Sequence, residues 1–184
     1  MLKALLSRQI TRLERTWNYD ASYVRELLDA SPLTFLKFMV ATSMTPRRDA
    51  PAEAIAAAGL VGTLAEDCGP CTQIGVDMAV RGGVDPKVLR AILEGDEAGM
   101  GADAALAYRF ARASLERDLW TADAVREEVV RRWGRKGLVA LALALTSARM
   151  YPTLKYALGH GRSCSRIVVA GEPAPVRKPL QMAA

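Results

Sequence analysis

Apolar residues recur at every third or fourth position along most of this chain, and proline or glycine interrupts the pattern at intervals typical of helices. This periodicity predicts an all-α protein, because the strict alternation of apolar and polar residues that marks a half-buried strand is almost absent. Only the sequence RIVVA, at 166–170, resembles a strand. The helices are expected at about 2–17, 22–30, 32–44, 51–64, 68–81, 86–94, 102–119, 121–133, 138–150 and 152–158.

Two helix starts are marked by a capping residue followed by proline, at Ser31-Pro32 and Asp85-Pro86. A side-chain oxygen at the cap accepts a hydrogen bond from a free backbone N–H. Proline is tolerated at the next position, because the N–H that it lacks has no partner in the first turn. We expect both pairs to begin helices.

The last third of the chain is predicted to contain three helices. Thr121 is expected to cap the first of them, and Gly134 to end it. The segment 138–150 is apolar nearly all round, so we expect a central buried helix there. Pro152 is expected to begin a short final helix.

Composition places the chain among globular proteins, with 184 residues, 51% of them hydrophobic and 24% charged. The most apolar run, 137–150, is shorter than the roughly 20 residues that cross a bilayer, so we expect a cytoplasmic protein without a membrane partner. The net charge is +5, and no run of Lys and Arg interleaves with aromatic residues. Nucleic acid is therefore not an expected partner.

Cys68 and Cys71 form a CGPC motif at the start of an expected helix. The free N–H groups and the positive dipole end of a helix stabilise a thiolate, and the spacing of three residues lets the two sulfurs close a disulfide. Glu66 and Asp67 have the opposite effect, because negative neighbours raise a thiol pKa. We therefore expect a redox pair in which the first thiol is only weakly activated.

Two other interpretations of the cysteine pair remain open. A zinc site would need further ligands, and His160 and Cys164 form an HxxxC that would complete a Cys₃His set. Alternatively the two cysteines are inert and buried, as free cysteines often are. We favour the redox pair, and we expect neither a metal nor a cofactor.

With helices on both sides of the CxxC, the chain resembles the alkylhydroperoxidase D and carboxymuconolactone decarboxylase superfamily. The resemblance rests on AEDCGPCTQIGVDMAVRGGV, VLRAILEGD and ALAYRFARASL, and LALALTSARMYPTLKYALG resembles one branch of the superfamily. It implies a compact helical bundle that self-associates, and either reduction of hydroperoxides or disulfides through Cys68 and Cys71 or a lactone decarboxylase activity. The chain is thus expected to consist of an N-terminal helical extension (1–50), a core (51–160) and an extended C-terminal tail (161–184), which we expect to be mobile from Gly171 onward.

In redox members of this superfamily a Glu and a His relay protons to the second cysteine, which attacks the peroxide while the first resolves. Here those two positions hold Ala56 and Gly75. The resemblance therefore implies slow turnover with an external dithiol as reductant, because proton relays contribute about 10²- to 10⁴-fold in rate. Glu66 and His160 are the candidates for a substitute relay, and we expect Cys71 to lie deeper than Cys68.

The helix at 2–17 is basic and amphipathic, with leucines and Trp17 on one face. Such a helix can lie on a membrane surface. It can equally pack against a second subunit, and we favour this interpretation because the resemblance implies a homo-oligomer.

Overall fold

The protein is described by a computed structural model, which covers residues 2–46, 48–161 and 167–177. The prediction of a mostly helical single domain is confirmed, since eight helices make up 75% of the structure in its described part. A small two-stranded sheet completes it. The elements are α1 (Leu2–Trp17), α2 (Ser22–Ala30), α3 (Pro32–Thr42), α4 (Ala52–Ala65), α5 (Gly69–Arg81), α6 (Pro86–Glu94), α7 (Gly101–Glu116), α8 (Leu119–Ala157), β1 (Val168–Val169) and β2 (Glu172–Pro173).

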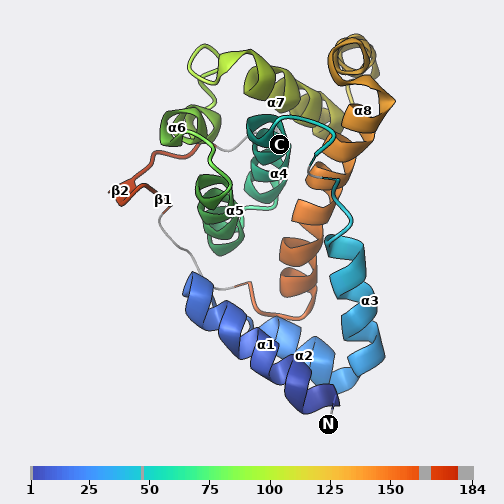
Figure 1. The fold of residues 1–184 in the computed structure, drawn as a ribbon, viewed down its shortest axis with the longest axis vertical. Coiled ribbons are helices and arrows are strands. Elements are labelled where there is room, and N and C mark those ends of the chain that lie inside the picture. Colours follow the sequence, from blue (N-terminus) through green and yellow to red (C-terminus); the bar gives the residue numbers. More distant parts are fainter. Residues whose placement is uncertain (1, 47, 162–166, 178–184) are drawn as a thin grey trace.

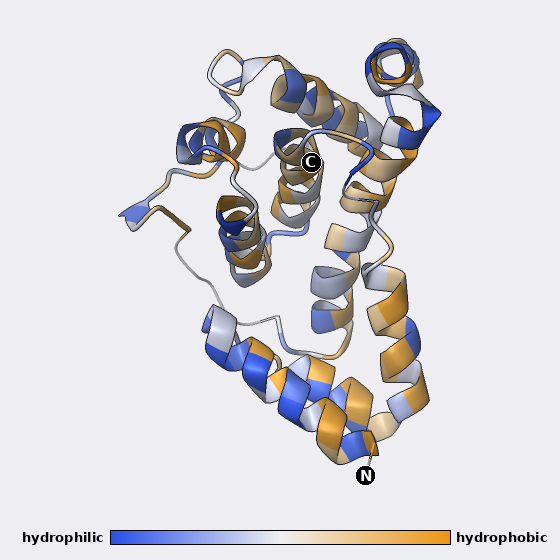
Figure 2. Cartoon of the chain, viewed as in Figure 1, coloured by the Kyte–Doolittle hydropathy of each residue, from blue (hydrophilic) through white to orange (hydrophobic). Residues whose placement is uncertain are grey.

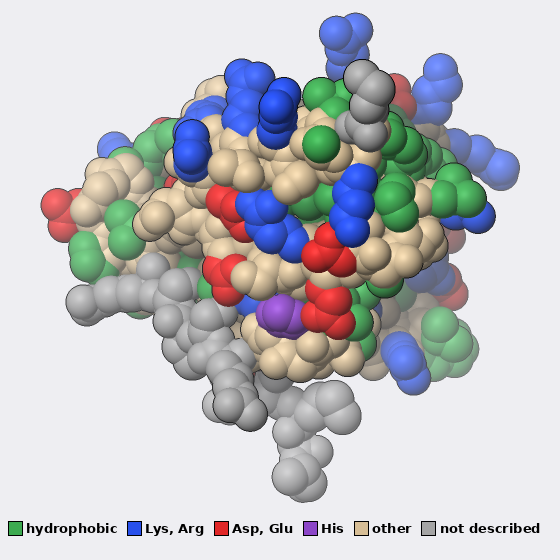
Figure 3. All heavy atoms as spheres, turned by 90° about the horizontal axis from the view of Figure 1, so that it is seen from below, with side chains coloured by type: hydrophobic (Ala, Val, Ile, Leu, Met, Phe, Trp, Pro, Cys, Tyr) green, Lys and Arg blue, Asp and Glu red, His purple; other side chains and the backbone are tan. Residues whose placement is uncertain are grey.

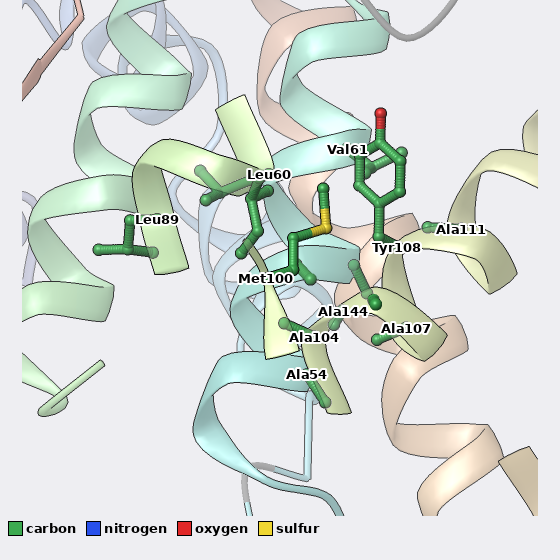
Figure 4. Packing of buried hydrophobic residues seen from close by; sticks show 14 of the residues in the cluster. Ala54, Leu60, Val61, Leu89, Met100, Ala104, Ala107, Tyr108, Ala111 and Ala144 are labelled. Carbon is green, nitrogen blue, oxygen red and sulfur yellow. The ribbon is translucent and has the colours of Figure 1, made fainter. Parts of the chain in front are cut away.

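The main core forms around α4, which packs against α5, α6, α7 and α8 (Figure 1). Ala54, Ala57 and Ala58 of α4 are completely buried, and this helix meets alanines of α7 and α8 around Leu60 and Met100 (Figure 4). Small side chains let these helices approach closely. The approach is closest at Gly62, where an added Cβ would lie 2.9 Å from the Leu145 carbonyl oxygen on α8.

A second hydrophobic cluster joins α1, α2 and α3, and hydrophobic residues run along all three helices in Figure 2. Leu6 and Ile10 of α1 are buried in it, whereas Leu2 and Leu5 are exposed. Ile74 of α5 and the C-terminal part of α8 also pack against this cluster. Helices α5 and α8 therefore connect the N-terminal helices to the main core.

Both predicted cap-and-proline starts are confirmed. The Ser31 side chain accepts a hydrogen bond from the Thr34 N–H at the start of α3, and Asp85 accepts one from Lys87 at the start of α6. Each proline occupies the first turn of its helix. These local signals set the two boundaries without help from tertiary packing.

Of the three helices expected in the last third, the break at Gly134 is confirmed, because α8 consists of two helical parts joined by a kink there, whereas the separate short helix from Pro152 is not found. Asp118 rather than Thr121 is the N-cap, and it accepts a hydrogen bond from the Thr121 N–H. Gly134 is non-helical, with φ 70° and ψ −176°, so it ends the first part of α8, and the second part begins directly after it. Pro152 is buried inside the second part of α8, and its neighbours Tyr151 and Leu154 pack against the cluster of the N-terminal helices.

The segment 138–150 is buried on one side only, contrary to the expectation of a helix surrounded by protein. Ala140, Leu141 and Ala144 face the core, whereas Val139 is 52% exposed. By length and apolar composition α8 is the one described helix that could cross a membrane, a criterion that the core helix of a soluble protein also meets. Its packing against α4 and α7 is that of a core helix.

Residues 167–177 contain the short hairpin predicted in part by RIVVA. Val168 pairs with Pro173 in an antiparallel register, and positive φ angles at Ala170 and Gly171 form the two-residue turn. Ile167, Val169 and Ala174 are buried in the main core. The mobile tail expected from Gly171 onward is thus fixed to the core as far as residue 177, and 178–184 lie outside the described residues.

Candidate functional site

Cys68 and Cys71 form a disulfide across the first turn of α5, with their Cα atoms 5.3 Å apart. Cys68 is the N-cap residue, and Gly69 and Pro70 form the first turn of the helix. The preceding Asp67 has a φ of 51°, a left-handed conformation that turns the chain from α4 into α5. The CGPC sequence therefore places both sulfurs at the positive end of the α5 dipole.

Two threonines fix the backbone of this turn. The Thr72 hydroxyl donates to the Cys68 carbonyl over 3.0 Å and lies 3.0 Å from the Thr63 hydroxyl. The Cys68 N–H donates to the Thr63 carbonyl, which closes the loop onto the end of α4. Both threonines are buried, so these bonds are shielded from water.

Two further contacts hold the turn against α8. The Arg149 Nε lies 2.6 Å from the Glu66 Oε1 in an ion pair, and the Tyr156 hydroxyl donates to the Asp67 carbonyl over 2.9 Å. Glu66 was a candidate for the proton relay, but its carboxylate is bonded to Arg149 and makes no hydrogen bond to either cysteine in the described part of the chain. The ion pair also offsets the negative charge expected to act on Cys68.

Both cysteines are buried, and the prediction that Cys71 lies deeper is wrong. Cys68 is 3% exposed and Cys71 is 8% exposed. The reason is that the loop carrying Cys68 folds down onto Thr63, whereas Cys71 faces the N-terminal helices. Only a small part of the surface of either cysteine is therefore accessible to a reagent in solution.

Next to Cys71 lie two buried tyrosines that the sequence did not single out. The Tyr19 hydroxyl is 3.8 Å from the Cys71 sulfur and 3.0 Å from the Tyr23 hydroxyl. Their rings meet edge to face, with centroids 6.4 Å apart. Burial raises the pKa of Tyr19 and of Tyr23, so both hydroxyls keep their hydrogen at neutral pH.

A lysine completes this group of side chains. Lys155 of α8 is only 2% exposed, and its Nζ lies 5.7 Å from the centroid of the Tyr19 ring. Burial lowers the pKa of Lys155, and the charge of Asp20 opposes this shift. Hydrogen bonds from Ser22 hold the pKa of Asp20 below its usual value, which keeps Asp20 ionised. We call Tyr19, Tyr23 and Lys155 the tyrosine–lysine cluster.

His160, the other candidate for the relay, is at the surface, beside acidic side chains in Figure 3. Its Nε2 lies 2.8 Å from the Glu26 Oε2 on α2. The imidazole packs against the Tyr23 ring, with centroids 6.4 Å apart. Through Tyr23 it touches the tyrosine–lysine cluster, but it makes no hydrogen bond to a cysteine in the described part of the chain.

Gly75 of α5 packs against Leu60 of α4, and Ala56 is partly buried against the main core, and neither position carries a polar group. An added Cβ at Gly75 would lie 3.1 Å from the Leu60 Cδ2, so a larger side chain there would require Leu60 to move. Gln73, on the next face of α5, bonds both the N–H and the carbonyl of Val168 in β1. That face holds the hairpin and contributes nothing to the cysteine pair.

The zinc alternative finds no support in the part of the chain that the structure describes. No three of its His, Cys, Asp or Glu side chains are grouped so that they could hold a metal ion. Cys164, the fourth ligand in that hypothesis, lies outside the described residues. The site can make and break a disulfide between Cys68 and Cys71. This disulfide lies beside the buried Tyr19 hydroxyl, and the buried Lys155 amine lies over the Tyr19 ring.

No family model matches the chain, and comparison with curated proteins and with solved structures also finds no match.

Proposed function

We propose that the protein is a thiol–disulfide oxidoreductase that reduces hydroperoxides or disulfides through Cys68 and Cys71. The observation that carries this proposal is the disulfide across the first turn of α5. The position supports it, since a helix N-terminus stabilises the thiolate that each half of the cycle requires. The helical architecture is compatible with an alkylhydroperoxidase D-like scaffold, which remains part of the proposal, as does a cytoplasmic location.

The proposed cycle starts with a Cys71 thiolate, which attacks the terminal oxygen of a hydroperoxide. The O–O bond breaks, Cys71 becomes a sulfenic acid, and the alkoxide takes up a proton. The Cys68 thiol then attacks the Cys71 sulfur, which forms the disulfide and releases water. An external dithiol attacks Cys68, is oxidised to its own disulfide and restores both thiols. With a disulfide substrate, the first step forms a mixed disulfide instead.

The cycle is expected to be slow. Ala56 and Gly75 supply no base where redox members of the family carry Glu and His, and Glu66 is occupied by Arg149. The contact with Tyr19 supports Cys71 as the attacking sulfur. We assign the contact with the reductant to Cys68, as the resemblance implies, so this N-cap residue, which is 3% exposed, has to become accessible when the dithiol binds.

The test is consumption of cumene hydroperoxide, or of a small aromatic disulfide, with dithiothreitol as the electron donor. We expect turnover that Cys68→Ser and Cys71→Ser each abolish. The matched control is Cys164→Ser, which removes the third thiol and should leave turnover unchanged. Turnover that survives loss of Cys71 would disprove the proposal.

The burial of both sulfurs favours a second candidate, a non-redox protein that uses the same scaffold for binding or assembly. Alkylation of the reduced, folded protein separates the two. A redox site requires that at least one of the two cysteines reacts before the protein unfolds. If both react only in denaturant, the binding function replaces the redox function.

A further inference from the structure

We propose that Tyr19 is a catalytic residue of the thiol site, whose hydroxyl donates a hydrogen bond to the Cys71 sulfur when that sulfur is a thiolate. This inference rests on the proposed function, because it assigns a role within the same redox cycle. It is carried by the 3.8 Å between the Tyr19 Oη and the Cys71 Sγ, a contact between residues 52 positions apart. In place of the proton relay sought in the sequence around the cysteines, the turn between α1 and α2 supplies a hydrogen-bond donor to Cys71.

The hydroxyl is held in place from three sides. The Tyr19 N–H donates to the Glu14 carbonyl, which fixes the turn after α1. The Tyr23 ring meets the Tyr19 ring edge to face, and Lys155 lies over the Tyr19 ring. Tyr19 is buried, so its hydroxyl has little access to water and depends on these protein partners.

The contact between Tyr19 and Cys71 depends on the redox state, because the Tyr19 hydroxyl has only one hydrogen to donate. A tyrosine hydroxyl has one hydrogen and two acceptor positions. Beside the disulfide, Tyr19 donates to Tyr23 over 3.0 Å. A thiolate is only an acceptor, so on reduction the Tyr19 hydrogen turns toward Cys71 and the Tyr23 hydroxyl donates to the Tyr19 oxygen. Reduction of the disulfide therefore requires only that the hydroxyl groups of Tyr19 and Tyr23 rotate.

The charges around Tyr19 favour its role as a hydrogen-bond donor to a Cys71 thiolate. Burial raises the pKa of Tyr19, so the group acts as a hydrogen-bond donor and not as a base. Protonated Lys155 adds positive potential on the side of Tyr19 that faces α8, which favours a thiolate. Among the described residues, the titratable groups that act on Tyr19 are Tyr23, Asp20, Tyr151 and Lys155.

The donor acts at a defined step. When the external dithiol attacks Cys68, the bond between the two sulfurs breaks and its electron pair stays on Cys71. The Tyr19 hydrogen bond stabilises this leaving thiolate, as well as the same thiolate before it attacks substrate. The N-terminal helices thus contribute to the site itself as well as to the fold.

The test measures the rate at which iodoacetamide alkylates Cys71 as a function of pH, in full-length reduced protein with Cys68→Ser. Tyr19→Phe removes one oxygen and keeps the ring. We expect it to raise the pH midpoint of Cys71 alkylation by about one unit, because a hydrogen bond to a charged group is lost. The matched control is Tyr151→Phe, which deletes another hydroxyl of the same region that is bonded to Thr42 and should leave the midpoint unchanged.

Incorporation of 3-fluorotyrosine at position 19 keeps the packing and makes the hydroxyl a stronger donor, so the midpoint should fall. The 3-fluorotyrosine protein tests the role of the Tyr19 hydroxyl even if Tyr19→Phe does not fold. An equal midpoint in all four proteins would overturn the inference. Alkylation needs no turnover, so a protein that shows these shifts without reducing any substrate would refute the proposed function and leave the Tyr19 contact standing.

Discussion

At the scale of single residues, the Cys68–Cys71 disulfide is contacted by the hydroxyl of Tyr19, and Lys155 lies over the ring of that tyrosine. The spacing of Cys68 and Cys71 was sufficient to predict that they can close a disulfide, since both lie within one helical turn. Tyr19 and Lys155 lie far from them along the chain and reach the site only through tertiary packing. Nothing in the local pattern around these two residues distinguishes them from other partly apolar side chains of a helical protein.

The buried tyrosines give the protein a specific dependence on alkaline pH. Burial raises the pKa of Tyr23 above the ordinary value of 10.0, so the unfolded state loses this proton first. The stabilisation is fully present below pH 10 and is lost as pH rises further, by about 1.4 kcal/mol per pH unit for one tyrosine. We expect the free energy of unfolding in urea to fall more steeply above pH 10 in the wild type than in Tyr23→Phe.

Between pH 7 and 9 the difference between these two proteins should stay constant, which serves as the internal control. If the free energy of unfolding falls equally with pH in the wild type and in Tyr23→Phe between pH 9 and 11, this would contradict the burial of Tyr23. Absorbance of the phenolate in the folded protein gives an independent reading, since Tyr23 should ionise only when the chain unfolds.

At the scale of the elements, helix ends with a clear local signal were predicted well, and the interior of α8 was not. Ser31 and Asp85 set their boundaries by direct hydrogen bonds. Gly134 divides α8 into two helical parts as its sequence signal predicts, but Pro152, which carries a similar signal, lies inside the second part. The neighbours of Pro152 pack against the N-terminal helices, and a single sequence does not reveal such contacts.

The contact between α4 and α8 leads to a prediction about two glycines one turn apart. An added Cβ at Gly62 would lie 2.9 Å from the Leu145 carbonyl oxygen, whereas one at Gly59 has 4.0 Å to its nearest neighbours. We expect Gly62→Ala to lower the free energy of unfolding by about 1–3 kcal/mol. Gly59→Ala should instead raise it by about 0.5–1 kcal/mol, because alanine loses less backbone entropy in a helix.

Urea denaturation of both variants measures these changes. Gly62→Ala should also weaken the contact between Arg149 and Glu66, since the Arg149 Cγ lies 3.2 Å from the added Cβ. Equal effects of the two substitutions would show that α4 and α8 are not in close contact at Gly62.

At the scale of the whole molecule, the described surface leaves large apolar side chains uncovered. Trp120 is 90% exposed next to an exposed Leu119 at the start of α8. We propose that the chain self-associates through this end of α8. Light scattering coupled to size-exclusion chromatography should give a multiple of the monomer mass.

Trp120→Glu should lower that mass, and Trp120→Phe should preserve it, because phenylalanine keeps an apolar ring. A monomer at all concentrations would contradict self-association.

The account depends most on whether the two sulfurs exchange electrons in the folded protein. Mass spectrometry of the reduced, folded protein before and after mild peroxide tests this directly. We predict the loss of two hydrogens, located in the tryptic peptide that contains both Cys68 and Cys71, and their return on treatment with dithiothreitol. A peptide that remains in the dithiol form while other residues are oxidised would contradict the account.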